Sequence, residues 1–90
     1  MNKNRRKQLS ELQDRISEVL STIESIKDEL DGLKDEEEEY KDNMPESLQG
    51  SDKYDAAETA VSEMEDALSN MDDAIGALEG ARDSIDNAKS

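Results

Sequence analysis

The sequence predicts an all-α fold, an antiparallel two-helix coiled-coil hairpin. Apolar residues recur with a seven-residue period in both halves of the chain, and the only proline lies between the halves. The composition supports this prediction, because 40% charged and 2% aromatic residues leave too little apolar material for a multilayer core. The fold must therefore be held by a seam, a narrow strip of side chains shared by two long helices.

Residues 8–43 are predicted to form the first helix. Its apolar residues alternate steps of three and four, which is the spacing of heptad positions a and d. Only Glu37 interrupts this stripe. Position a holds Leu9, Ile16, Ile23, Leu30 and Met44, and position d holds Leu12, Val19, Ile26, Leu33 and Tyr40. Residues 1–7 precede this helix as a basic N-terminal arm containing Lys3, Arg5, Arg6 and Lys7. The arm is expected either to lie beside the negative end of the second helix or to contact a polyanion.

Residues 44–51 are predicted to form the turn. Pro45 has a fixed φ and no N–H, so a helix arriving from the N-terminal side should end just before it. Gly50 can adopt the left-handed conformation that closes a turn, and Ser51 or Asp52 can cap a following helix.

Residues 52–88 are predicted to form the second helix, antiparallel to the first. Position a holds Tyr54, Val61, Leu68 and Ile75, and position d holds Ala57, Met64, Met71, Leu78 and Ile85. A turn centred near Ser47 would set Tyr40 against Tyr54, Leu33 against Val61, and Arg82 against Leu12. Lys27, Lys34 and Lys41, at position e of the first helix, would then meet the acidic e positions of the second: Glu58, Glu65, Asp72, Glu79 and Asp86.

Position g of the second helix is a strip of alanines, which we call the alanine strip. Charged residues usually stand at this position. The alanines are explained either by helix propensity or by a second packing face for a homodimer that forms a four-helix bundle. The residues predicted for this oligomer face are Ala60, Ala67, Ala74 and Ala81.

The net charge of -14 points away from nucleic acid or anionic membrane as a partner of the acidic body, and towards a protein partner. The run of acids at residues 35–39 is either a solvated helix face or a charged contact surface. The residues predicted to contact a partner are Asp28, Asp31, Asp35, Glu36, Glu38, Glu39 and Asp42. Carboxylates diverge on a straight helix, so no metal site is expected, and no cofactor is expected either.

Enzyme activity is not expected, and no catalytic residue is assigned. The sequence has no His and no Cys, and no apolar pocket is evident that would shift a carboxylate pKa. No apolar run approaches the roughly 20 residues that cross a bilayer. A cytoplasmic protein is therefore expected.

The segment from Asn43 to Tyr54 resembles a family of small acidic coiled-coil proteins from phages and mobile elements. The resemblance rests on an Asn-x-Pro-Glu-x-Leu-Gln turn followed by a Ser-acid-base-Tyr helix start. It implies a mobile-element setting and a bacterial host cytoplasm. It assigns no functional residue.

These observations lead to one functional hypothesis and two alternatives. The hypothesis is a non-enzymatic, phage-encoded inhibitor that binds a bacterial defence or nucleic-acid-acting protein, by mimicry of DNA. One alternative is a structural or assembly coiled-coil protein of a virion or mobile element. The other is a small regulator that binds nucleic acid through its basic N-terminal residues.

Overall fold

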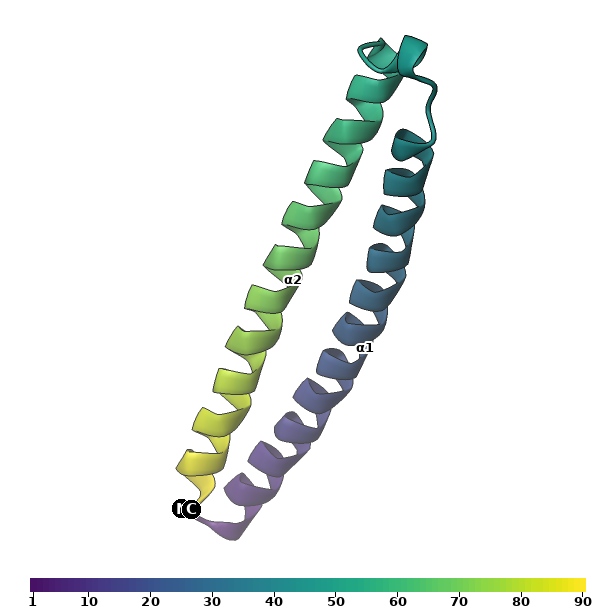
Figure 1. Ribbon diagram of the computed structural model, residues 1–90. Helices are drawn as coiled ribbons and strands as arrows, with labels where there is room; N and C mark the ends of the chain where they lie inside the picture. Colours follow the sequence, from purple (N-terminus) through teal and green to yellow (C-terminus); the bar gives the residue numbers. More distant parts are fainter. The chain divides into compact units, whose positions relative to one another are not determined.

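The computed structural model describes residues 1–90 and shows an all-α antiparallel helical hairpin (Figure 1). Helix α1 spans Lys3–Asp42, the 3₁₀ helix η1 spans Glu46–Leu48, and helix α2 spans Asp52–Lys89. The chain divides into two compact units. The terminal unit comprises Met1–Ser25 and Met71–Ser90, and the turn unit comprises Ile26–Asn70.

Helix α1 begins earlier than the sequence suggested. The Asn2 side-chain Oδ1 accepts a hydrogen bond from the Arg5 backbone N–H at 2.8 Å, which satisfies one of the unpaired donors at the start of the helix. Residues 3–7 are therefore helical, and the separate basic arm predicted for residues 1–7 is wrong.

The turn is built by proline, glycine and serine in the roles that their chemistry favours. Pro45 precedes η1 with φ -57° and ψ 149°, and Gly50 has φ 138°, a conformation that side-chain-bearing residues rarely adopt. The Ser51 hydroxyl donates to the Leu48 carbonyl at 2.5 Å and accepts from the Tyr54 N–H at 3.3 Å. Ser51 therefore caps α2, which settles the choice between Ser51 and Asp52.

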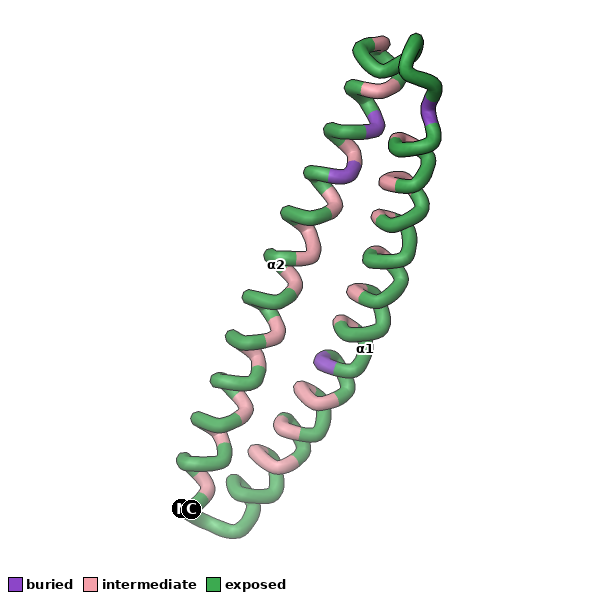
Figure 2. The backbone as a smooth tube through the Cα atoms, viewed as in Figure 1, coloured by how far each residue is buried: buried purple, intermediate pink, exposed green.

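The two helices turn different heptad positions towards each other. Residues at positions a and d of α2 are buried or half-buried, as the sequence predicts (Figure 2). In α1 the covered positions are a and e, so the predicted seam is confirmed at position a and wrong at position d. Its position d side chains are exposed, and Leu20, at position e, is buried with 6% exposure.

The terminal unit is joined by hydrogen bonds as well as by apolar contact. The Arg82 Nη1 donates to Ser17 Oγ at 3.2 Å, and the Arg82 carbonyl accepts from Gln13 Nε2 at 3.1 Å. Lys89 Nζ donates to Ser10 Oγ at 3.1 Å. Arg82 and Lys89 stand at position a of α2, and each donates to a serine hydroxyl of α1. For Arg82 the predicted counterpart was Leu12.

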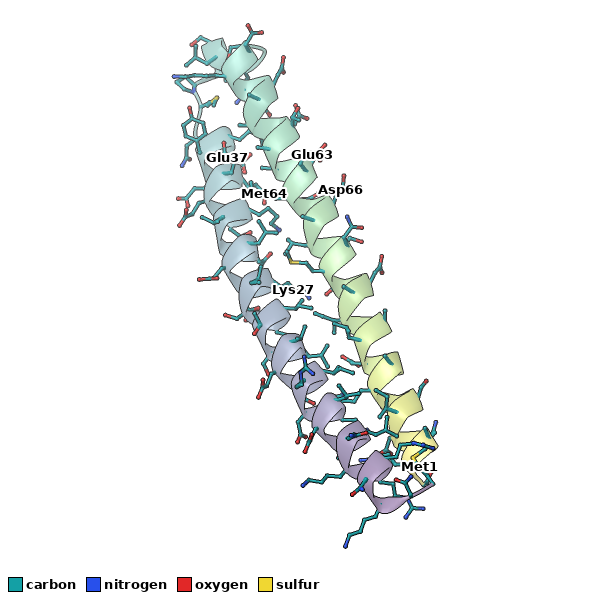
Figure 3. The ribbon with its side chains drawn as sticks, turned by 180° about the vertical axis from the view of Figure 1, so that it is seen from behind. Met1, Lys27, Glu37, Glu63, Met64 and Asp66 are labelled. Atoms are coloured by element: carbon teal, nitrogen blue, oxygen red, sulfur yellow. The ribbon has the colours of Figure 1, made fainter.

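The turn unit holds three of the four buried residues, Met44, Ala57 and Val61. Ala57 and Val61 belong to α2, and their small side chains allow α1 to approach closely. Met64 lies on the side of α2 that faces α1, whereas Glu63 and Asp66 are exposed on its outer side (Figure 3). Tyr40 is 49% exposed, because its position d points away from the contact. Its predicted place in the seam against Tyr54 is therefore wrong.

Candidate interaction surfaces

The predicted partner-binding carboxylates form an outward-facing strip on α1 within the turn unit. We call it the acidic shaft. Six of its seven residues are exposed and Glu38 is half-buried. They stand at heptad positions b, c, f and g, outside the covered positions a and e, so the exposed carboxylates are open to a partner. The acidic shaft consists of Asp28, Asp31, Asp35, Glu36, Glu38, Glu39 and Asp42.

Two lysines of α1 neutralise part of the acidic shaft from within the same helix. Lys34 Nζ lies 3.5 Å from an oxygen of Asp31 and 3.5 Å from an oxygen of Asp35. Lys41 Nζ lies 3.9 Å from Asp42 Oδ1. These ion pairs of Lys34 and Lys41 are with acids of α1, whereas the sequence assigned both lysines to the acidic positions of α2.

The pKa of Lys34 reflects these contacts. Partial desolvation lowers the pKa of Lys34. The charges of Asp31 and Asp35 and the hydrogen bonds to both carboxylates together raise it by more than desolvation lowers it, so the pKa lies above the ordinary value of 10.5. Lys34 is therefore protonated throughout the physiological range, and the acidic shaft carries a fixed positive charge near its middle.

No group of three or more carboxylates converges on a point where it could hold a metal ion. Side chains on a helix radiate from its axis, which keeps neighbouring carboxylates apart. Neither helix contains a stretch long and apolar enough to cross a membrane.

The alanine strip is covered unevenly. Ala60 and Ala67, in the turn unit, are half-buried, whereas Ala74 and Ala81, in the terminal unit, are exposed. In the turn unit these small side chains widen the face of α2 that meets α1. In the terminal unit they stay open to solvent.

A second exposed surface was not foreseen from the sequence. The d positions of α1 had been assigned to the seam, but they are between 43% and 56% exposed. The one signal for this arrangement was Leu20, an apolar residue at position e that the a and d pattern does not need. We call this surface the apolar column: Leu12, Val19, Ile26, Leu33 and Tyr40.

The apolar column borders a groove in the terminal unit and a hollow in the turn unit. The groove has a volume of about 320 Å³ and is lined by Leu12, Arg15, Ile16, Val19, Leu78 and Ile85. The hollow has a volume of about 340 Å³ and is lined by Tyr40, Asn43, Met44, Pro45, Leu48 and Lys53. Both are open to solvent.

The four basic residues near the start of the chain are exposed on the first turns of α1. They are Lys3, Arg5, Arg6 and Lys7.

No family model, no curated protein and no solved structure matches the chain.

Proposed function

We propose that this chain is a non-enzymatic acidic interaction protein that inhibits a bacterial defence or nucleic-acid-acting protein by presenting the acidic shaft in place of DNA. The observation that carries the proposal is the exposure of the acidic shaft along one side of a regular helix. A phage or mobile-element origin, a bacterial host cytoplasm and a protein partner belong to the same proposal, on the resemblance of the turn.

The charge density of this region supports mimicry of a nucleic-acid strand. Residues 28–42 contain nine acids and two bases, a net charge of -7. Fourteen helical steps of about 1.5 Å make this segment about 21 Å long, which gives about one net charge per 3 Å. A single strand of duplex DNA carries one charge per about 3.4 Å. A protein groove lined with Lys and Arg can therefore neutralise this helix much as it neutralises a phosphate backbone.

The test is capture from a bacterial lysate with the wild-type chain and with two matched triple variants. Glu36→Gln, Glu38→Gln and Glu39→Gln together remove three charges of the acidic shaft. The control removes three charges from exposed glutamates elsewhere in α1, through Glu11→Gln, Glu18→Gln and Glu24→Gln. Both variants keep the helix length and nearly the same side-chain volume.

We expect the wild-type chain and the control to retain a DNA-binding protein that added duplex DNA displaces and that high salt releases. The acidic-shaft variant should lose it. A captured protein whose binding is the same for both variants, or that duplex DNA does not displace, would contradict mimicry.

The apolar column favours a second candidate function, a structural or assembly protein of a virion or mobile element. An apolar strip on an otherwise polar helix is typical of a surface that another helix covers. In that case, retention of the partner would depend on Leu33 and Ile26 and would persist in high salt, because apolar contact is not screened.

A further inference from the structure

The apolar column leaves this chain with surface that the hairpin does not cover. No side chain is fully buried, and only four residues are buried. The chain exposes 6444 Å², whereas a typical folded monomer of 10.0 kDa exposes about 5,200 Å². The surplus exceeds the roughly 800 Å² that each partner loses in a standard protein interface.

The occupant that fits this surface is another long helix. Helix α1 is unbroken over Lys3–Asp42, and the seven-residue spacing of the apolar column places its members along one side of that helix. Each of the five is between 43% and 56% exposed. A partner helix with the same seven-residue period would cover every member.

Helix α1 itself is such a partner. If two copies of α1 pair antiparallel with Ile26 facing Ile26 on the two-fold axis, Val19 of each copy faces Leu33 of the other. Leu12 then faces Tyr40 in the same way. In this arrangement every member of the apolar column faces an apolar residue of the other copy. A symmetric dimer interface requires such self-complementarity.

The charges beside the apolar column agree with this pairing. Position g of α1 flanks the column on the side away from α2, and its residues Arg15, Thr22, Glu29 and Glu36 are exposed. Antiparallel pairing about Ile26 brings Arg15 of one copy beside Glu36 of the other, and Thr22 beside Glu29. No acid at position g meets another acid, although the chain as a whole has a net charge of -14.

We propose that the chain forms a symmetric homodimer in which the apolar columns of two α1 helices pack antiparallel about Ile26. This differs from the dimer predicted from the alanine strip, because the contact is made by α1. It uses a different surface from the acidic shaft, with which it shares only Glu36. It competes with the second candidate function for the apolar column.

Disulfide trapping tests the register directly, because the chain contains no native cysteine. Ile26→Cys should form a covalent dimer with itself under mild oxidation, since residues on the two-fold axis are neighbours. Val19→Cys should not couple to itself, but a mixture of Val19→Cys and Leu33→Cys should give the mixed dimer. Ser21→Cys, on the outer side of α1, is the control and should stay monomeric.

Sedimentation measures the association itself. We expect twice the monomer mass of 10.0 kDa at micromolar concentration for the wild-type chain. Ile26→Asp should weaken association by about 100-fold or more, because it places two unpaired carboxylates in an apolar contact. Ser21→Asp adds the same charge outside the contact and should leave association unchanged.

Exchanging the charges of Arg15 and Glu36 tests the same contact with residues outside the apolar column, in case Ile26→Asp disturbs the hairpin. Arg15→Glu should weaken the dimer by roughly tenfold, and adding Glu36→Arg should restore it. A monomer at every concentration would overturn the proposal. Self-coupling of Val19→Cys in place of the mixed dimer would overturn the antiparallel register, and a dimer that survives Ile26→Asp would overturn the assigned face.

Discussion

The two units of the hairpin hold their helices together in different ways. In the terminal unit, Arg82 and Lys89 of α2 reach across to Ser17 and Ser10 of α1. In the turn unit, the small residues Ala57 and Val61 are buried, and the ion pairs of Lys34 lie within α1. A basic residue at a seam position is therefore accommodated by polar partners, whereas an alanine at such a position allows close packing.

The largest effect is expected from a charge placed in the packed region of the turn unit. Val61→Asp should lower the free energy of unfolding by about 3 kcal/mol, because the carboxylate would be buried without a partner. Ser62→Asp is the control, since Ser62 is exposed next to it and should shift stability by about 0.5 kcal/mol or less. Urea denaturation followed by far-UV circular dichroism measures both. Equal effects would show that Val61 is not a packing residue.

A smaller loss is expected from the one buried side chain of the terminal unit. Leu20→Ala should lower the free energy of unfolding by about 2–3 kcal/mol through lost apolar contact and a residual cavity. Val19→Ala, one residue away and 48% exposed, should change it by less than about 0.5 kcal/mol at concentrations where the chain is monomeric. A larger loss for Val19→Ala would contradict the assignment of position e to the contact.

The hydrogen bonds of the terminal unit are expected to contribute less than its buried leucine. Arg82→Met keeps the aliphatic stem but removes the hydrogen bond to Ser17, and should cost about 1 kcal/mol. Ser17→Ala should cost about the same, and the double variant should cost little more than either one alone. Additive losses in this double-mutant cycle would mean that the two side chains are not coupled.

The smallest effect is expected from titration of Lys34 in the turn unit. Its pKa is raised in the folded chain, so its contribution to stability is fully present below the unfolded value of 10.5 and is lost as the pH rises through the folded pKa. Thermal denaturation between pH 9 and 12 should therefore show a shallower alkaline decline for Lys34→Gln than for the wild-type chain. Identical pH profiles would show that the ion pairs of Lys34 do not contribute to stability.

Much of the fold could be predicted from the sequence because the heptad pattern and the turn residues act locally. Pro45, Gly50 and Ser51 determine where helices stop and start through their own backbone and side-chain chemistry. The helix boundary near residue 3 was missed because the basic run looked like an arm, although Asn2 is a good cap.

The orientation of α1 could not be predicted in the same way. Apolar residues mark positions a and d, but which side of α1 faces α2 also depends on long side chains at position e. At position e, Leu20 is buried and Lys34 and Lys41 are half-buried, since lysine can bury its aliphatic stem and keep its charge in water. The apolar column becomes visible only once that rotation is known. The acidic shaft, in contrast, followed from the sequence because charged residues stay outside in either orientation.

The orientation of α1 is tested most directly by thiol labelling at two neighbouring positions. Leu20→Cys and Val19→Cys each introduce a single thiol into a chain without cysteine, and the labelling rate is measured at high dilution, where the chain is monomeric. We expect the thiol at position 19 to react nearly as fast as an unfolded control and the thiol at position 20 to be strongly protected. Protection at position 19 with rapid labelling at position 20 would contradict the orientation of α1 and, with it, the apolar column.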